Sequence, residues 1–160
     1  MFNFKHAFGA AAFSLAVALG ADAGLAASKQ TPIWISGDRG GHVIRYALKV
    51  AKAKQSGQRV AIGGRCASAC TLYLSMPKAK MCVSKGAQFA FHMPYGASSR
   101  SNRLAAAYMM RKYPSWVRSW ISRNGGLRSR MITMNYAYAS KFLPTCTARK
   151  GGSGSLFAKL

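Results

Sequence analysis

Two short apolar runs, each followed by a turn and a helical segment, constrain the fold of this chain more than any other feature. The first run, at 32–36, ends at a glycine-rich turn at 37–41, and apolar residues then recur at helical spacing through 42–55. The second run, at 59–63, leads into a segment at 68–74 that we expect to form a buried helix. Strand, helix, strand and helix in this order favour parallel strands joined by right-handed crossovers. The sequence therefore predicts an α/β fold with a mostly parallel sheet.

The remainder of the chain is expected to complete the sheet and to add a helical carboxyl-terminal part. Two further short strands are predicted at 80–83 and 88–92. Helices are predicted at 102–112, at 115–122 and over the longer segment 127–142. A length of 160 residues suits one domain with a single core rather than two.

Residues 1–27 are typical of an export signal. Lys5 precedes the apolar run 7–20, and small residues suitable for cleavage follow it. An uncleaved membrane anchor is the alternative, but the run is short for a membrane span of about 20 residues and its alanines and glycines make it weakly hydrophobic. We therefore expect a mature α/β domain at 28–150 and a flexible, glycine- and serine-rich tail at 151–160, in a periplasmic or secreted protein.

Four cysteines follow the expected signal, and an even number in a small exported domain usually means disulfides. Of the three pairings, we favour Cys66 with Cys70, which lie four positions apart. Cys82 would then pair with Cys146 and tie the last segment to the core. A zinc site is the alternative, but it lacks the paired Cys-x2-Cys spacing of zinc ribbons. Disulfide formation would also remove any thiol nucleophile at Cys66 or Cys70.

Acidic residues are almost absent from the chain. It has 24 lysines and arginines but 2 acidic residues, Asp22 and Asp38, and a formal net charge of +22. Mechanisms that need paired carboxylates are therefore nearly excluded, and oxygen-ligand sites for Ca²⁺ or Mg²⁺ are disfavoured. We expect no metal and no cofactor. Asp38 precedes a glycine pair, so we expect it to cap that turn or to pair with an arginine rather than to act in catalysis.

A surface this basic is expected to attract polyanions. In an exported protein these would be anionic lipids, anionic envelope polymers such as lipopolysaccharide, or acidic peptides. Nucleic acid would bind through its phosphates alone and without sequence specificity, because no zinc-finger, RNA-recognition or helix-turn-helix signature occurs. Since every copy carries the same charge, we expect a monomer or a small oligomer. One stretch is especially basic: Arg100, Arg103, Arg111, Lys112, Arg118, Arg123, Arg128 and Arg130.

Three features in chain order are suited to acyl transfer when they are taken together. The glycine pair 40–41 follows the first predicted strand, Ser68 lies at a strand-to-helix junction, and His92 ends a later strand. Taken alone, a glycine pair is usually a turn, a serine before a helix is usually an N-cap, and a lone histidine is usually structural. Together they offer a nucleophile, a base and, through the N–H groups of Gly41 and Ala69, donors for an oxyanion.

The same segments resemble the proteolytic subunit of the Clp protease family. Residues 64–74, with Cys-Ala-Ser-Ala-Cys at their centre, are similar to the Gly-x-Ala-Ala-Ser segment that holds the family's nucleophile. Residues 91–96, Phe-His-Met-Pro-Tyr-Gly, are similar to its His-Gln-Pro-x-Gly segment, and residues 34–41 to its strand followed by Asn-Ser-Pro-Gly-Gly. Behind an export signal, the Cys-Ala-Ser-Ala-Cys core looks like the exported Clp-like proteins of bacteria.

The resemblance implies a ClpP/crotonase fold of stacked ββα units, shortened at the amino terminus. It implies Ser68 as nucleophile and His92 as base, with the N–H groups of Gly41 and Ala69 forming the oxyanion hole. The implied activity is that of a serine hydrolase acting on peptide bonds. Because an exported protein has neither cytosolic ATP nor an unfoldase partner, such a peptidase would be independent of ATP.

The family's aspartate, which orients the catalytic histidine, has no counterpart here, because no acidic residue follows Asp38. Thr133 or Asn135 lies near the expected place and is the predicted partner of His92 through a neutral hydrogen bond. The missing acid also favours a second hypothesis. In it the fold is kept without catalysis, and the protein binds anionic envelope polymers or a lipid surface through its positive charge.

Overall fold

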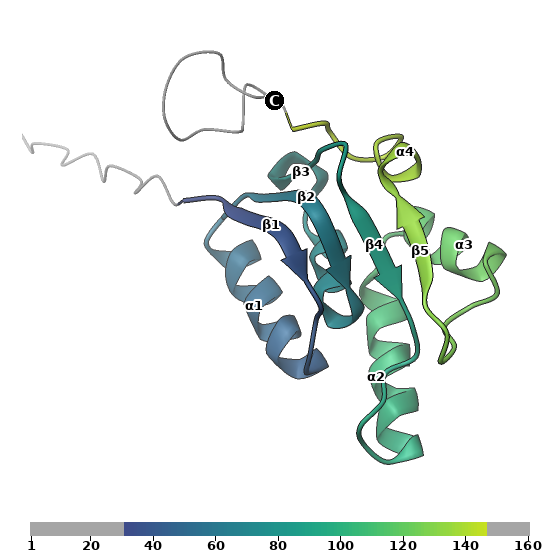
Figure 1. Cartoon of the computed structure of the whole chain (residues 1–160). Coiled ribbons are helices and arrows are strands. Elements are labelled where there is room, and N and C mark those ends of the chain that lie inside the picture. The colour runs from purple at the N-terminus through teal and green to yellow at the C-terminus, as the bar shows by residue number, and fades with distance from the viewer. Residues whose placement is uncertain (1–30, 147–160) are drawn as a thin grey trace, which may run out of the picture.

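The structure has an α/β fold. Its mixed sheet is organised around strand β2, which pairs with three other strands. The computed structural model describes residues 31–146 (Figure 1). The hydrogen-bonded order is β1-β2-β4-β5, with β3 also paired to β2. In Figure 1 the strands β1, β2 and β4 run in one direction and β5 runs against them. The strands are β1 (Ile33–Asp38), β2 (Val60–Ala67), β3 (Met81–Val83), β4 (Gln88–Phe91) and β5 (Ile132–Asn135).

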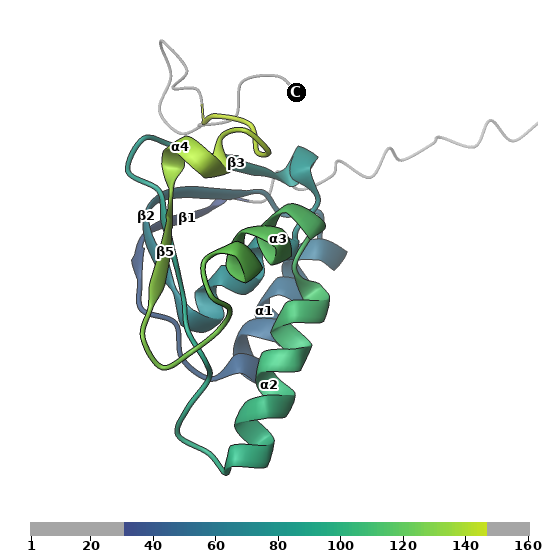
Figure 2. The ribbon, with the colours of Figure 1, turned by 90° about the vertical axis from the view of Figure 1, so that its right-hand side faces the viewer.

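Helices cover one face of this sheet, as Figure 2 shows for the three longest of them. These three are α1 (Val43–Gln55), α2 (Ser99–Lys112) and α3 (Ser115–Arg123). The chain also forms the short helix α4 (Tyr136–Ala139) and two 3-10 helices, η1 (Ser68–Ser75) and η2 (Lys78–Lys80). The predicted α/β class and the mostly parallel sheet are confirmed. The predicted signal at 1–27 and tail at 151–160 lie outside the described residues. No helix within 31–146 is long and apolar enough to cross a membrane.

β2 is longer than predicted and carries two neighbours on one edge. Its first half pairs with β3 and its second half with β4, both in parallel. On its other edge β1 comes so close that a Cβ on Gly64 would lie 1.6 Å from the carbonyl oxygen of Ser36. The glycine therefore lets the strand continue to Ala67, which places the next residue, Ser68, at the carboxyl edge of the sheet.

The helix predicted at 127–142 is wrong. The segment holds β5, which pairs antiparallel with β4, and the four-residue helix α4. Met134 lies opposite Phe89 and both are fully buried, whereas Thr133 is exposed. This alternation is the pattern of a strand with one buried face. The free edge of β4 and the aromatic core beneath it outweigh the local helical preference.

An aromatic cluster fixes α3 and the carboxyl-terminal segment against β4. The rings of Trp116 and Phe142 stack with centroids 4.8 Å apart. Phe91 of β4 contacts both Tyr113 and Trp120, with centroids 5.7 Å apart in each case. Such pairs add to the stability gained from apolar burial, so the cluster closes the core on the side away from α1.

Both disulfides follow the predicted pairing, Cys66 with Cys70 and Cys82 with Cys146, and the zinc alternative is thereby excluded. Cys82 lies in β3, and the N–H of Cys146 also donates a 2.8 Å hydrogen bond to the carbonyl of Val83. The bond between Cys82 and Cys146 therefore ties the end of the described chain to the middle of the sheet.

The two disulfides are expected to stabilise the fold unequally. Cys82–Cys146 spans 64 positions and Cys66–Cys70 spans 4. From the entropy of closing the unfolded chain, the long loop is worth about 4 kcal/mol and the short one about 2 kcal/mol. Thermal unfolding of the double alanine variants should therefore show the larger fall in Tm for Cys82→Ala/Cys146→Ala. An equal or larger fall for Cys66→Ala/Cys70→Ala would contradict this.

Candidate active site

The structure brings the candidate residues to one edge of the sheet. Gly40 and Gly41 follow β1, Ser68 follows β2 and His92 follows β4, and these three strands are parallel. Because the carboxyl ends of parallel strands meet at one edge, residues distant in sequence come together there. All four line one cavity of about 1140 Å³.

Ser68 has a backbone conformation that is unusual for a residue with a side chain. Its φ is +55°, and among residues 31–146 no other non-glycine residue has a positive φ. Such a conformation costs about 1–3 kcal/mol and persists where its surroundings enforce it. In α/β-hydrolases a sharp turn between a strand and a helix presents a serine hydroxyl above the sheet. The partly exposed Ser68 has this placement.

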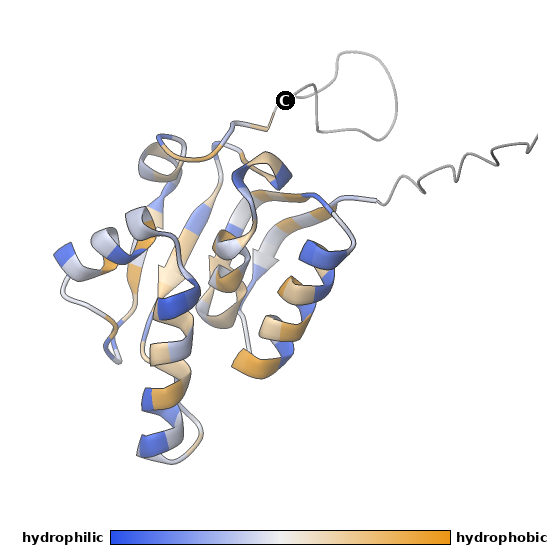
Figure 3. Cartoon of the chain, turned by 180° about the vertical axis from the view of Figure 1, so that it is seen from behind, coloured by the Kyte–Doolittle hydropathy of each residue, from blue (hydrophilic) through white to orange (hydrophobic). Residues whose placement is uncertain are grey.

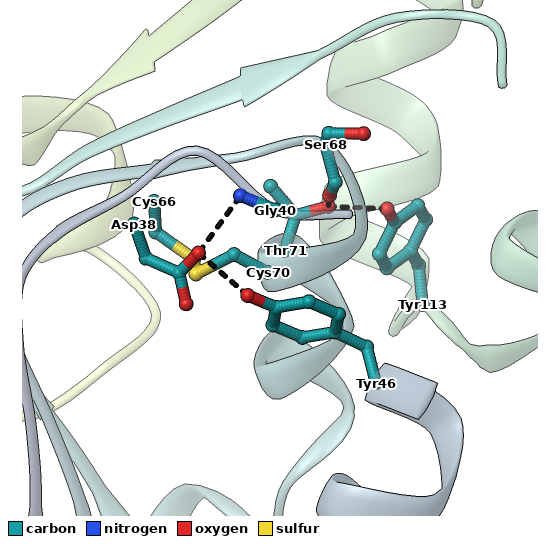
Figure 4. The surroundings of a disulfide bond; sticks show 8 residues. All are labelled: Asp38, Gly40, Tyr46, Cys66, Ser68, Cys70, Thr71 and Tyr113. Atoms are coloured by element: carbon teal, nitrogen blue, oxygen red, sulfur yellow. Dashed lines mark hydrogen bonds between the residues drawn. A yellow bond between two sulfur atoms is a disulfide. The ribbon is translucent and has the colours of Figure 1, made fainter. Parts of the chain in front are cut away.

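Hydrogen bonds hold the Ser68 turn from the side of η1. The Thr71 hydroxyl donates to the Ser68 carbonyl oxygen over 2.6 Å, and it also lies 2.5 Å from the Tyr113 hydroxyl (Figure 4). Thr71 is fully buried, and burial raises the pKa of Tyr113 well above its usual range. Tyr113 therefore stays protonated, and the arrangement links the turn to the residue that follows α2.

The disulfide Cys66–Cys70 closes the same turn covalently. Its cysteines stand two positions before and two after Ser68, and both are fully buried. Figure 4 shows the disulfide beneath the turn and the Ser68 hydroxyl pointing away from it. Since both sulfurs are bonded, neither is available as a thiolate nucleophile. Their role in this structure is to fix the backbone that carries Ser68.

Asp38 caps the glycine turn. One carboxylate oxygen accepts hydrogen bonds from the Gly40 N–H over 2.8 Å and from the Tyr46 hydroxyl over 2.6 Å (Figure 4). Burial, and next the hydrogen bond to Asp38, raise the pKa of Tyr46 far above its usual range, so its hydroxyl remains a donor. The expected turn-capping role is confirmed.

Gly40 packs directly on the Ser68 turn. Its φ is +83°, and a Cβ there would lie 2.4 Å from the Ala67 carbonyl oxygen and 2.8 Å from the Ser68 Cβ. Because Asp38 occupies the Gly40 N–H, Gly41 is the next backbone donor along the turn. Ala69 lies in the first turn of η1, where an N–H has no acceptor within the helix. The two candidate oxyanion donors therefore belong to segments in contact.

His92 is held by a backbone carbonyl. Its side chain is 5% exposed, and its Nδ1 lies 2.8 Å from the carbonyl oxygen of Met93. A carbonyl oxygen only accepts, so Nδ1 carries the proton and Nε2 is left as an acceptor. The backbone of Met93 is also held through its N–H, which donates to the Arg128 carbonyl over 2.8 Å. This is the tautomer that a base acting through Nε2 needs.

The predicted partners of His92 lie elsewhere. The Asn135 side chain caps α4 by accepting the Tyr138 N–H over 3.0 Å. Thr133 is exposed in β5, opposite Ala90. Within residues 31–146 neither hydrogen-bonds the imidazole, whose Nδ1 partner is the Met93 carbonyl. A main-chain carbonyl has no signature in sequence, so no motif could have indicated it.

Ser68 and His92 share the cavity without touching through a hydrogen bond. In the described part of the chain neither the Ser68 hydroxyl nor His92 Nε2 has a hydrogen-bond partner. In hydrolases without substrate, such contacts are often long and shorten when substrate binds. The unused acceptor and the unused hydroxyl face one cavity, which is the arrangement from which a nucleophile and its base can engage a substrate.

The chain matches no family model and no curated protein. Among solved structures it is similar to a crystal structure described as an enzyme, over 72% of this chain and 76% of that one, with 12% identity and a TM-score of 0.51. A peptidase from Plasmodium falciparum matches with 12% identity and a TM-score of 0.49, over 72% and 75% of the two chains. A mutant ClpP1 from Listeria monocytogenes matches with 21% identity and a TM-score of 0.42, over 69% of each. These likenesses concern the fold.

The contact of Gly40 with the Ser68 turn is expected to be required for stability. Gly40→Ala would force a Cβ against the Ala67 carbonyl at a positive φ, so the free energy of unfolding should fall by about 2 kcal/mol or more. Gly37→Ala is the matched control in the same strand-to-turn segment, because a Cβ there meets nothing within 4 Å. Urea unfolding of both variants checks this, and equal stabilities would contradict it.

Proposed function

We propose that this chain is a serine hydrolase that cleaves peptide bonds without ATP, with Ser68 as nucleophile and His92 as base. The observation that carries the proposal is the positive φ of Ser68 at the edge of a cavity that it shares with His92 and the glycine pair. Three separate features hold that conformation: the Cys66–Cys70 disulfide, the hydrogen bond from Thr71 and the packing of Gly40. The sequence resemblance to the Clp proteolytic subunit supports the same assignment.

The reaction would follow the usual course of acyl transfer. His92 Nε2 takes the proton of the Ser68 hydroxyl as the oxygen attacks the substrate carbonyl carbon, and the N–H groups of Gly41 and Ala69 bind the oxygen that becomes negative. His92 then returns the proton to the leaving amine, and the peptide bond breaks. Water attacks the acyl-enzyme in the second half, with His92 again taking and returning a proton.

The Met93 carbonyl would do part of the work of the missing acid. By accepting the Nδ1 proton over 2.8 Å it keeps the imidazole in the required tautomer. A neutral carbonyl stabilises the imidazolium less than a carboxylate does, and loss of the acid in a full triad costs about 10⁴ in turnover. We therefore propose a slow hydrolase, active outside the cytoplasm, where its two disulfides would persist.

A fluorophosphonate probe tests the nucleophile. The oxidised protein should gain one adduct, Ser68→Ala should gain none, and His92→Gln should react about 10²-fold more slowly or worse. Ser101→Ala is the control, because Ser101 lines the same cavity with its own hydroxyl. Mass spectrometry of the intact protein gives the readout, with circular dichroism to show that each variant is folded. A folded wild type without an adduct at Ser68 would overturn the hydrolase proposal.

One observation favours the second hypothesis, in which the protein binds envelope polyanions without catalysis. Asp38 is the sole acidic residue among those described, and its carboxylate is engaged by Gly40 and Tyr46. Within residues 31–146 one carboxylate therefore stands against all the lysines and arginines, so the surface charge is almost uncompensated. Binding to anionic vesicles that weakens steeply with salt, in a protein without a Ser68 adduct, would favour this function instead.

A further inference from the structure

Exposed apolar side chains gather around the cavity that contains Ser68 and His92. Large hydrophobic residues rarely stay exposed together unless they serve an interaction. Of the six exposed ones in the described residues, Trp34 lies outside the cavity. The other five line it, and they come from four separate segments: Ile44, Leu48, Tyr95, Leu104 and Met131.

Two helices form the apolar walls. On α1, Ile44 and Leu48 lie one turn apart and are 64% and 66% exposed. On α2, Leu104 and Tyr108 repeat this spacing across the cavity. Figure 3, which views the molecule from behind, shows orange, apolar stretches on both helices. The volume of about 1140 Å³ exceeds the 300–1,000 Å³ or so of a typical small-molecule pocket, so it suits an extended chain of several groups.

Two arginines line the same cavity on the side of the sheet. Arg39 immediately precedes Gly40, whose backbone contacts the Ser68 turn, and Arg65 lies in β2 three positions before Ser68. Asp38, the sole carboxylate side chain in the described residues, is engaged by Gly40 and Tyr46. Arg65 Nη2 already donates to the Met131 sulfur over 3.3 Å, but a thioether sulfur is a weak acceptor, so a ligand carboxylate would displace it and form charge-assisted hydrogen bonds here.

We propose, on the basis of the hydrolase function above, that the cavity selects peptides in which a bulky apolar residue stands beside an acidic residue or a terminal carboxylate. The apolar side chain would enter between α1 and α2, and the carboxylate would lie against Arg39 and Arg65 near the nucleophile. Charge complementarity at the sheet side and apolar area at the helix side together define this substrate class.

A peptide fits the lining better than a fatty acyl chain. Besides its apolar walls the cavity is lined by residues with polar groups, among them Ser101 and Asn102 in the first turn of α2 and Gly41 after β1. The Ser101 oxygen accepts from the Ser98 hydroxyl and the Asn102 Nδ2 group donates to the Ala97 carbonyl, which leaves the Ser101 hydroxyl proton and the Asn102 Oδ1 for a ligand. The amide groups of a peptide can bond to these atoms, whereas an acyl chain would only remove their hydration. A fatty acid shares the apolar and anionic chemistry, so it serves as a comparison ligand.

Binding is measured on the full oxidised chain with Ser68→Ala, so the readout does not depend on catalysis. Fluorescence anisotropy compares three labelled peptides of equal length: one with adjacent Leu and Glu, one with Gln for Glu and an amidated end, and one with Ser for Leu. The first should bind about tenfold or more tightly than either of the others. Equal affinity for the first two would overturn the role of the carboxylate.

Matched variants separate the cavity from the general positive charge. In the Ser68→Ala background, Arg39→Gln or Arg65→Gln should reduce about tenfold the preference for the peptide with Leu and Glu over its amidated counterpart with Gln. Arg111→Gln, an exposed arginine of α2 outside the cavity, removes the same charge and should leave the preference unchanged. An equal loss in all three variants would mean general electrostatic attraction and would overturn the proposal.

Two further outcomes are decisive and distinct. Leu104→Ser should weaken binding of the peptide with Leu and Glu and leave binding of the peptide with Ser for Leu unchanged. Equal effects on both peptides would overturn the role of the helix walls. If palmitate displaces the labelled peptide with Leu and Glu at a concentration equal to or lower than the unlabelled peptide needs, the choice of a peptide as ligand is overturned. Because none of these measurements needs Ser68, a missing fluorophosphonate adduct alone would refute hydrolysis and leave the binding result standing.

Discussion

The backbone of one residue, Ser68, is the constraint on which the rest of the site depends. A positive φ at a side-chain residue is unfavourable in isolation, and three separate features enforce it here. The Cys66–Cys70 disulfide closes the turn, the Thr71 hydroxyl holds the Ser68 carbonyl, and Gly40 packs against the turn from β1. Because these features come from both sides of the turn, the hydroxyl points to the cavity as a consequence of the fold rather than of its own preference.

The shortage of acidic residues shapes both the scaffold and the chemistry. The sole described carboxylate, Asp38, holds the glycine turn by accepting two hydrogen bonds, and it is thereby withdrawn from His92. The histidine uses the Met93 carbonyl instead. The arrangement keeps the orientation that an acid would provide but not its charge. Asp38 therefore serves the scaffold, because its hydrogen bonds hold the turn that brings Gly40 against Ser68.

The sequence predicted the segments that meet at the carboxyl edge of the sheet better than it predicted the periphery, for physical reasons. Ser68, His92 and the glycine pair follow apolar strands, so their positions at strand ends could be inferred from local pattern. The cysteine pairing followed from spacing and was confirmed. The strand β5 was missed, because its identity depends on pairing with β4 and on burial of Met134 beneath it. The Met93 carbonyl could not be predicted, since a backbone acceptor is independent of residue type.

The electrostatic attraction due to the high net charge acts over longer distances than the contacts within the cavity do. At physiological ionic strength charges are screened beyond about 8 Å, so most of the basic residues affect how often an anionic chain encounters the protein rather than how it sits in the site. Arg39 and Arg65 differ because they line the cavity beside the Ser68 turn, with Asp38 already engaged. Long-range attraction by itself selects for charge alone. The proposed selection for charge next to an apolar group requires both within one cavity, and the described residues provide both at the edge of the sheet that carries Ser68.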